Sequence, residues 1–204
     1  MNWHVEAPNF VEKINHPKSF YLTEFSSGAT KVLGDRINEA IDLGQPIFSI
    51  YIESPGGNVS SLTAVLSIMS SARNKGLQIA TICAGEACSA GALVFCFGDN
   101  NLRFIGEHAT LMIHGFQAGQ YPGRATEQKE YFDRVVKQET EVFEVISTHM
   151  KGAKKKNWLK SELGKRKDID WYLNATEAIE CGVASHIGLP TFSLKLSSEI
   201  SIEL

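Results

Sequence analysis

A strand, a turn and an amphipathic helix follow one another twice in the middle of this chain, and this repeat restricts the fold more than any other feature. Ile47–Ile52 is a nearly continuous apolar run rich in β-branched and aromatic residues, which is typical of a strand covered on both faces. The turn Ser54–Asn58 (SPGGN) comes next, and apolar residues at helical spacing then extend to Gly76. Strands that alternate with helices predict parallel βαβ units and an α/β fold.

The second unit begins with a predicted strand at Leu77–Cys83. We expect a turn at Ala84–Glu86 and then a short, wholly apolar helix at Ala87–Phe97, with Ser89 in its first turn. A serine between small residues has two interpretations: a close-packing point between helices, or a nucleophile at a helix start. This stretch alone does not decide between them.

Further strands and helices on both sides continue the α/β pattern. A short strand at Phe20–Leu22 and a helix over Ala29–Gly44 precede the first unit, and strands at Leu102–Ile105 and Ala109–Ile113 follow the second. His114 stands at the end of the last of these strands.

Thr126 opens the longest helical pattern, whose roughly 25 residues would extend about 37 Å. Its apolar stripe runs from Phe132 to Met150. A domain of this size does not need such a helix to cover its own sheet. The helix therefore either packs partly on another subunit or is broken.

Composition excludes several classes of protein. With 204 residues, a net charge of -3 and 43% hydrophobic residues, the chain resembles an ordinary soluble globular protein, and no nucleic-acid partner is predicted. The longest apolar run, Ala92–Phe97, is too short for a bilayer, and the first residues lack a signal-peptide pattern, so we expect a cytoplasmic protein without a membrane partner. The basic clusters Lys151–Lys156 and Lys165–Lys167 are more typical of solvated loops than of a site for an acidic partner.

No cofactor or metal is predicted. The phosphate-binding pattern Gly-x-x-x-x-Gly-Lys-Ser/Thr is absent, and the paired glycines alone are a weak signal for a nucleotide. The cysteines form no Cys-x-x-Cys pair and are interpreted as reduced thiols rather than zinc ligands or disulfides. They are Cys83, Cys88, Cys96 and Cys181.

Three separated segments each present a residue type that nucleophilic catalysis uses. Ser89 stands at a helix start, His114 at a strand end and Asp170 just before a helix cap. A serine hydroxyl attacks only when a base takes its proton, and a carboxylate can fix the tautomer of that base. Backbone N–H groups at Gly57 and Ala90 are placed to stabilise a developing oxyanion. The set predicts acyl-transfer chemistry.

Five motifs, in the same order, resemble the Clp protease proteolytic subunit, a serine peptidase of family S14. They are Ser54–Gly57 (SPGG), Gly85–Ala92 (GEACSAGA), Met112–His114 (MIH), Gly123–Glu127 (GRATE) and Ala175–Gly182 (ATEAIECG). The 25-residue interval from Ser89 to His114 also fits that family. The resemblance covers about residues 20–188.

The resemblance implies a role for each candidate residue. Ser89 would be the nucleophile, His114 the base, Asp170 its orienting carboxylate, and the Gly57 and Ala90 amides the oxyanion hole. It also implies the ClpP/crotonase-like superhelix of repeated ββα units with a protruding handle helix. We expect an N-terminal arm over residues 1–19, a protease domain over 20–188 and a C-terminal extension over 189–204.

The resemblance further implies an assembly and its partners. Such subunits form heptameric rings, often stacked as double-ring tetradecamers through the handle helix, with active sites that face an inner chamber. An AAA+ unfoldase ATPase usually feeds the chamber with polypeptide substrates. An extended substrate would add a strand beside the glycine turn and the segment after His114.

The chain departs from the family pattern in four places. One is the insert-like basic segment near Lys151–Lys156, which lengthens the path from His114 to Asp170. Gly115-Phe116 follows His114 where the family usually has Gln-Pro, and Trp171 follows Asp170 where an arginine commonly joins ring-ring contacts. Residues 1–19 do not resemble the usual axial loops. These departures indicate a divergent member, and by association they favour a phage-encoded one.

Two other functions and one other residue stay open. A crotonase-like acyl-CoA enzyme shares the fold and uses two backbone amides, but it does not need the serine, histidine and aspartate. A non-catalytic ring subunit would be a scaffold or gate. If Asp170 does not orient His114, Asp168 or another carboxylate does.

Overall fold

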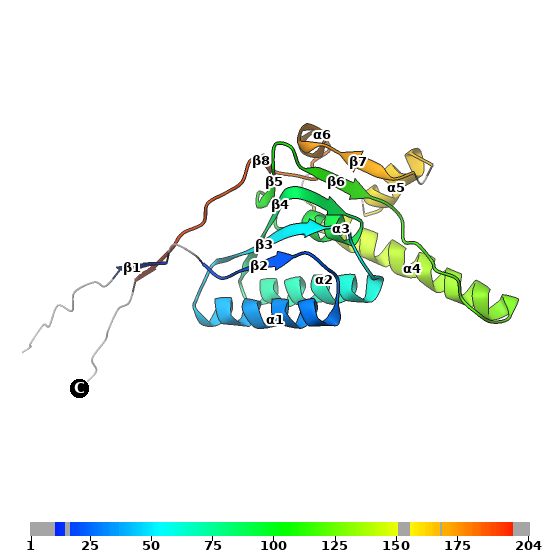
Figure 1. Cartoon of the computed structure of the whole chain (residues 1–204), viewed down its shortest axis with the longest axis horizontal. Helices are drawn as coiled ribbons and strands as arrows, with labels where there is room; N and C mark the ends of the chain where they lie inside the picture. Colours follow the sequence, from blue (N-terminus) through cyan, green and yellow to red (C-terminus); the bar gives the residue numbers. More distant parts are fainter. Residues whose placement is uncertain (1–10, 15–16, 151–155, 168, 198–204) are drawn as a thin grey trace, which may run out of the picture.

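The computed structural model of the chain describes residues 11–14, 17–150, 156–167 and 169–197. A twisted sheet lies at its centre, with helices packed against it and one long helix that extends from the body (Figure 1). The βα alternation expected from the sequence is confirmed, because the successive strands β2, β3 and β4 pair in parallel with a helix between each two.

The central sheet has seven strands in the order β2-β3-β4-β5-β8, with β6 and β7 branching from β4. Its pairs are parallel except for β6 with β7, which is antiparallel. The strands are β2 (Ser19–Leu22), β3 (Ile47–Ser54), β4 (Gln78–Cys88), β5 (Arg103–Ile105), β6 (Thr110–Ile113), β7 (Trp171–Leu173) and β8 (His186–Ile187).

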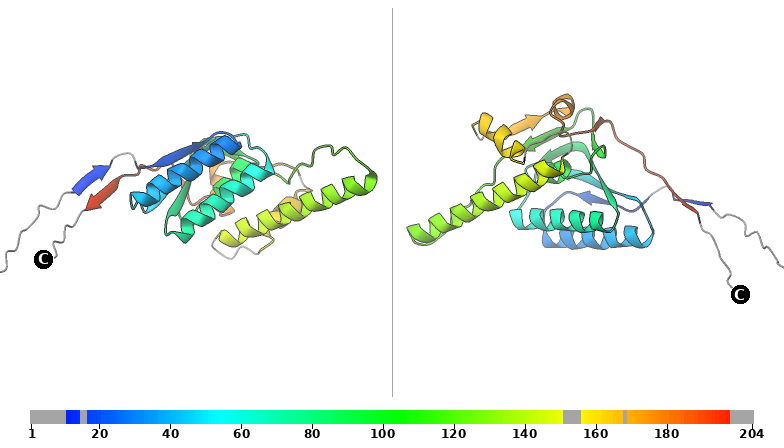
Figure 2. Two further views of the ribbon diagram at one scale, coloured as in Figure 1. Left: turned by 90° about the horizontal axis from the view of Figure 1, so that it is seen from below. Right: turned by 180° about the vertical axis from the view of Figure 1, so that it is seen from behind.

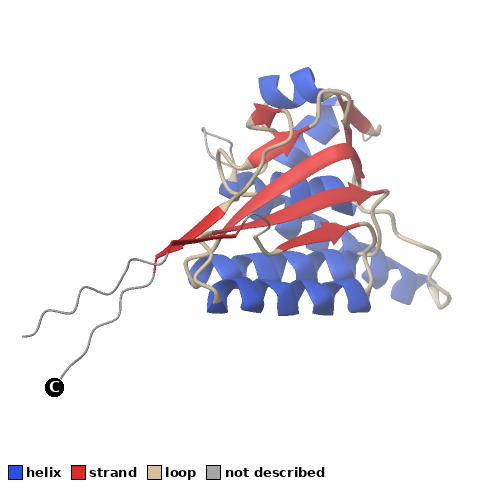
Figure 3. Cartoon of the chain, turned by 60° about the vertical axis from the view of Figure 1, so that its left-hand side comes forward, coloured by secondary structure: helices blue, strands red, loops and turns tan. Residues whose placement is uncertain are grey.

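Several helices begin where a side chain caps their free N–H groups. Ser26 accepts from the Ala29 N–H at 3.1 Å, and Asn174 accepts from the Glu177 N–H at 2.9 Å in the predicted capping box. The helices are α1 (Ser27–Asp42), α2 (Val59–Asn74), α3 (Ala90–Cys96), α4 (Ala125–His149), α5 (Trp158–Lys165) and α6 (Ala175–Glu180). Helices α1 and α2 lie side by side along the sheet (Figure 3).

Burial differs between the two faces of β3. Phe48, Ile50 and Ile52 are all buried on one face, whereas Tyr51 on the other face is half-buried and stacks on the exposed Tyr21 with ring centroids 4.7 Å apart. The prediction of coverage on both faces is therefore met only in part for β3, because Ser49 on the second face is buried, whereas Tyr51 is half-buried and Glu53 is exposed. Residues 79–83 of β4, in the middle of the sheet, are fully buried as expected.

Strand β4 is longer than predicted. The expected turn at Ala84–Glu86 is instead part of a strand that runs to Cys88. The reason is a change of partner: the first half of β4 pairs with β3 and β5, and Glu86–Cys88 pair with β6. Helix α3 consequently begins at Ala90, and Ser89 stands between strand and helix rather than inside the helix.

Helix α4 is continuous over its 25 residues, so the expectation of a possible break is not met. Its C-terminal part packs on the body through Val142, Phe143 and Ile146, and its N-terminal part extends away from it (Figure 1). Phe132 is 44% exposed and Val136 is 56% exposed on this part. No helix among the described residues has both the length and the apolar character needed to cross a bilayer.

The two ends of the described chain pair with each other. Strand β1 (Val11–Ile14) forms an antiparallel two-stranded sheet with β9 (Leu194–Ser197), which extends from the body (Figure 2). The predicted arm and C-terminal extension thus contact one another, and the proposed domain limits at 20 and 188 stay a prediction.

Three of the described residues of the basic clusters, Lys156, Lys165 and Arg166, have carboxylate partners. Lys156 pairs with Glu144 at 2.9 Å, and Lys165 and Arg166 pair with Glu162 at 2.6 and 3.0 Å. The rest of the first cluster, 151–155, lies outside the described residues. Lys165 belongs to the end of α5 rather than to a loop.

Candidate active site

Ser89 occupies a sharp strand-to-helix turn with a strained backbone. Its φ of 54° and ψ of -121° are unusual for a residue with a side chain. Its N–H donates to the Met112 carbonyl at 2.7 Å, which ties the turn to β6. A serine on such a turn is typical of hydrolases that hold a nucleophile above the end of a sheet.

Glycine is required where the turn after β3 approaches this serine. Gly56 has a φ of +108°, and a Cβ added there would lie 2.6 Å from the Ser89 Cβ. A Cβ on Gly57 would lie 2.5 Å from the Phe25 Cβ. The paired glycines of the Ser54–Asn58 turn therefore permit close contact on both sides.

Side chains at both ends of this turn fix its shape. The Ser54 hydroxyl accepts from the Gly56 N–H at 3.2 Å. Asn58 caps α2 by accepting from the Ser61 N–H at 2.7 Å, and its amide donates to the Phe25 carbonyl at 3.0 Å. The turn is thus held in place before any ligand binds.

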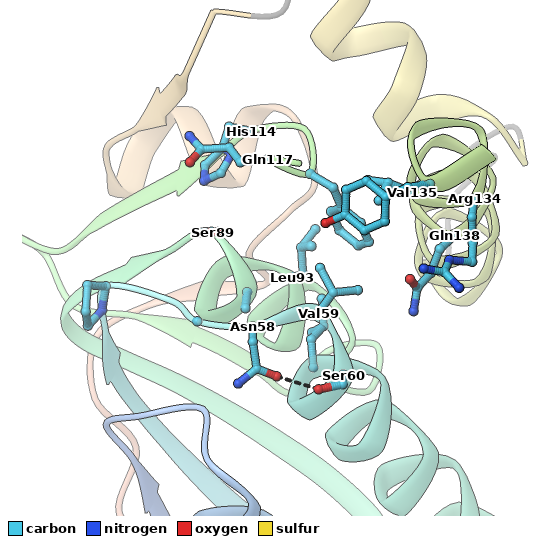
Figure 4. Close-up of a pocket in the computed structure, with 16 residues that line it drawn as sticks. Asn58, Val59, Ser60, Ser89, Leu93, His114, Gln117, Arg134, Val135 and Gln138 are labelled. Carbon is cyan, nitrogen blue, oxygen red and sulfur yellow. Dashed lines mark hydrogen bonds between the residues drawn. The ribbon is translucent and has the colours of Figure 1, made fainter. Parts of the chain in front are cut away.

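Parallel pairing brings His114 to the same edge of the sheet as Ser89. Cys88 of β4 is the register partner of Met112 of β6, so both strands deliver their next residues to one place. Ser89 and His114 line one cavity of about 710 Å³ (Figure 4). No hydrogen bond joins them among the described residues, and such bonds are often long without substrate.

The His114 ring is held by the backbone that follows it. Its Nδ1 lies 2.5 Å from the Gly115 carbonyl oxygen. When Nδ1 carries the proton and donates to this carbonyl, Nε2 has a free lone pair, as a general base requires. The arrangement therefore supports the tautomer needed to deprotonate a serine.

Asp170 stands immediately before β7, as His114 stands immediately after β6, and no side-chain hydrogen bond joins the two among the described residues. Antiparallel pairing of Ile113 with Trp171 makes His114 and Asp170 the next facing positions, on one face of the ribbon. Asp170 is exposed and does not line the cavity. The alternative carboxylate, Asp168, lies outside the described residues.

The two predicted oxyanion donors also line the cavity. Ala90 is the first residue of α3, where an N–H has no partner within the helix. Gly57 also lines the cavity and forms a bridge with Phe25. Both residues therefore border the cavity that contains Ser89, and their role as oxyanion donors stays a prediction.

Cys88, the neighbour of Ser89, is a poor competitor as nucleophile. Burial raises the pKa of its thiol, and the nearby Glu86 carboxylate raises it further. A thiol with a raised pKa is even less ionised at neutral pH than an ordinary one. Cys88 also does not line the cavity, whereas Ser89 does, so the Ser89 hydroxyl is the better candidate.

The far wall of the cavity comes from α4 and from the segment after His114. Phe116 and Gln117 belong to the segment after His114, which the resemblance placed beside the substrate. The residues on this wall that the sequence did not identify as part of a site are Tyr131, Arg134, Val135 and Gln138. Figure 4 shows Arg134, Val135 and Gln138 on α4, across the cavity from Ser89. Only the placement of α4, which helical periodicity does not give, could have revealed these four.

Glu139 attaches the segment after His114 to α4. Its Oε2 accepts from the Phe116 N–H at 2.5 Å, and the Phe116 ring packs edge-on against Phe143 at 5.8 Å. A Cβ on Gly115 would lie 2.9 Å from the same oxygen, so glycine permits the approach. A proline, usual at position 116 in the resembled family, would have no N–H, and Glu139 satisfies the one that Phe116 introduces.

These groups provide the parts of an acyl-transfer site: a hydroxyl, an imidazole and two candidate backbone donors. Among the described residues no group of three His, Cys, Asp or Glu side chains is arranged to hold a metal ion. The chain matches the Clp protease family over residues 37–190.

The chain belongs to the Clp protease family.

Two relatives illustrate this similarity. The chain is 32% identical over 139 residues to the ATP-dependent Clp protease proteolytic subunit 1 of Shouchella clausii, a match that covers 68% of this chain and 67% of that protein. It is 30% identical over 149 residues to the ATP-dependent Clp protease proteolytic subunit of Porphyromonas gingivalis. That match covers 73% of this chain and 62%, less than two thirds, of the relative.

The comparisons confirm part of what the sequence predicted. The resemblance to the Clp protease proteolytic subunit, the associated α/β fold and the enzyme class of the family, a peptidase, are confirmed. The roles of individual residues, the phage origin and the cytoplasmic location stay predictions.

Proposed function

We propose that this Clp protease family member is a serine endopeptidase that cleaves unfolded or extended polypeptides through an acyl-enzyme. The observation that carries the proposal is the strained Ser89 turn, which shares one cavity with His114 and two candidate oxyanion donors. A packing serine would not need a positive φ or an open cavity beside its hydroxyl.

Each residue has a defined role in the proposed mechanism. The Ser89 Oγ attacks the carbonyl carbon of the scissile bond while His114 Nε2 takes the hydroxyl proton. The Gly57 and Ala90 amides stabilise the oxyanion, and His114 gives the proton to the leaving amine as the C–N bond breaks. Water then hydrolyses the ester by the same steps, which restores Ser89.

Asp170 is proposed as the carboxylate that orients His114 when substrate is bound. Its facing position across the β6–β7 pair supports this role, although Nδ1 now bonds the Gly115 carbonyl. Asp170→Asn should lower kcat at least about tenfold, because an amide does not stabilise the imidazolium that forms. Peptide hydrolysis by the folded variant measures this, with Asp133→Asn on α4 as a matched exposed control. Unchanged turnover would assign the role to the Gly115 carbonyl or to Asp168.

The proposed assembly is a ring, heptameric by resemblance, with a double-ring tetradecamer as its stacked form. The apolar side chains that α4 exposes support a second subunit on this helix, since three of them are at least 44% exposed. They are Phe132, Val136 and Val145. A ring would enclose the cavities in a chamber that admits only unfolded chains.

An AAA+ unfoldase ATPase is the proposed partner that supplies substrate. The support is limited to the family and to the two relatives, whose names describe them as ATP-dependent proteolytic subunits. Extended polypeptide is proposed to lie between the glycine turn and the segment after His114, where backbone contacts tolerate varied side chains.

The purified full chain provides the direct test. We expect a fluorophosphonate probe to label the protein and unstructured peptides to be cleaved, with a native mass of seven or fourteen chains of 22.5 kDa. An assembled ring that neither labels nor cleaves would favour the scaffold. Thioester turnover without labelling would favour the crotonase-like enzyme.

A further inference from the structure

The cavity beside Ser89 has one side chain with a permanent charge. All the residues that line it are described, and among them only Arg134 carries a charge at every physiological pH. The other titratable side chains of the lining are His114 and Tyr131. Figure 4 shows Arg134 and Gln138, one helical turn apart, on the side of α4 that borders the cavity. Arg134 and Gln138 thus line the same cavity as Ser89, the proposed nucleophile.

Arg134 differs from its neighbouring cations on α4 in lacking a carboxylate partner. The cations nearest to it on α4 and at its N-cap form ion pairs with carboxylates of the same helix: Arg124–Glu127 at 2.6 Å, Lys129–Asp133 at 2.6 Å and Lys137–Glu141 at 3.9 Å. Among the described residues, no ion pair within 4.0 Å includes Arg134. Its charge is therefore available to a ligand in the cavity.

Aromatic contacts restrict the position of this guanidinium. The Arg134 Cζ lies 5.7 Å from the centre of the Tyr131 ring, and Tyr131 stacks on Tyr121 with centroids 4.7 Å apart. A cation held against a ring loses less conformational freedom when it binds a ligand. Arg134 is thus partly preorganised at the cavity.

We propose that Arg134 makes this cavity prefer an acidic side chain, Asp or Glu, next to the bond that is cut. The inference rests on the peptidase function proposed above. A guanidinium binds a carboxylate through two parallel hydrogen bonds, and Gln138 offers an amide donor one turn away. A substrate lysine at the same position is repelled by the Arg134 charge. The preference therefore comes both from attraction of acidic side chains and from repulsion of basic ones.

Matched peptides test the preference. The probes are two series of fluorogenic peptides. In one series the residue directly before the scissile bond is Glu, Gln or Lys, and in the other the residue directly after it is varied in the same way. We expect kcat/KM for Glu to exceed that for its neutral isostere Gln about fivefold, as for a partly exposed charge-assisted contact. The ratio should fall as salt is raised, because exposed charges are screened.

Two variants and one control assign the effect to Arg134. Arg134→Gln should bring the Glu/Gln ratio close to one, and Arg134→Glu should make Lys the preferred residue. Lys137→Gln removes a cation three residues along α4 that pairs with Glu141 and does not line the cavity. This control should keep the wild-type ratio and turnover.

The inference is overturned if Arg134→Gln keeps the wild-type Glu/Gln ratio, or if Lys137→Gln changes the ratio equally. A measurement of peptide binding distinguishes a failure of this inference from a failure of the peptidase proposal. Fluorescence anisotropy of the same labelled peptides with full-length Ser89→Ala reports the preference without cleavage. If wild type cuts no peptide but Glu-peptide binding still depends on Arg134, only the peptidase proposal fails.

Discussion

Ser89→Ala should lower peptide hydrolysis by at least about 10³-fold and abolish fluorophosphonate labelling, because it removes the only atom proposed to form a covalent bond with the substrate's carbonyl carbon. The substitution deletes one oxygen and leaves a Cβ in the same strained turn. The fold and the assembled mass should therefore not change. Active-site labelling, hydrolysis of an unstructured peptide and native mass are the three measurements.

A second serine provides the control for this experiment. Ser67 lies on α2, outside the cavity, and its hydroxyl donates to the Thr63 carbonyl at 2.8 Å. Ser67→Ala should keep labelling and turnover at wild-type values. Labelling of Ser89→Ala at the wild-type rate would place the nucleophile elsewhere and contradict the mechanism.

Local patterns predicted the elements that local chemistry determines. The apolar run Ile47–Ile52 lies within β3, and the cap formed by Asn174 and Glu177 has both of its hydrogen bonds. The extension of β4 through Ala84–Glu86 could not be predicted in this way. A small residue, a glycine and a glutamate favour a turn, but Glu86 pairs with β6, and the strand continues through Ala84 and Gly85 to reach this pairing.

The position of Asp170 beside His114 is a long-range property. Each residue flanks a short strand, β6 with four residues or β7 with three, and the sequence of neither strand indicates which strand it pairs with. Motif order suggested the pair, and the antiparallel register explains it. The bond from His114 to the Gly115 carbonyl could not be predicted, because it depends on ring orientation.

The cavity wall from α4 shows where sequence reasoning stops. Helical periodicity identifies the apolar stripe of α4 but does not say which charged residues beside it face a site. Lys129 and Lys137 pair with carboxylates on the surface. Arg134 instead borders the cavity, and Glu139 binds the Phe116 N–H. Which charges face a site depends on how the helix is docked.

Gly56→Ala is expected to have the second-largest effect, a loss of about 10²-fold in kcat/KM, since displacing a reacting group by about 1 Å can cost this much. The added Cβ would lie 2.6 Å from the Ser89 Cβ and 3.0 Å from the Cys88 carbonyl oxygen. Neither atom can rotate away as a flexible side chain would. The two turns must therefore separate, which moves Ser89 relative to the Gly57 amide.

Gly188→Ala distinguishes this contact from simple backbone strain. Gly188 has a φ of +115°, close to the +108° of Gly56, but a Cβ there would meet nothing within 4 Å. Both variants should lose about 1 kcal/mol or more of stability from a side chain at positive φ, measured by thermal unfolding. Only Gly56→Ala should also lose hydrolysis and probe labelling at temperatures where it is folded. Equal activity in the two variants would show that the glycine turn does not position Ser89, and the oxyanion role of Gly57 would lose its geometric basis.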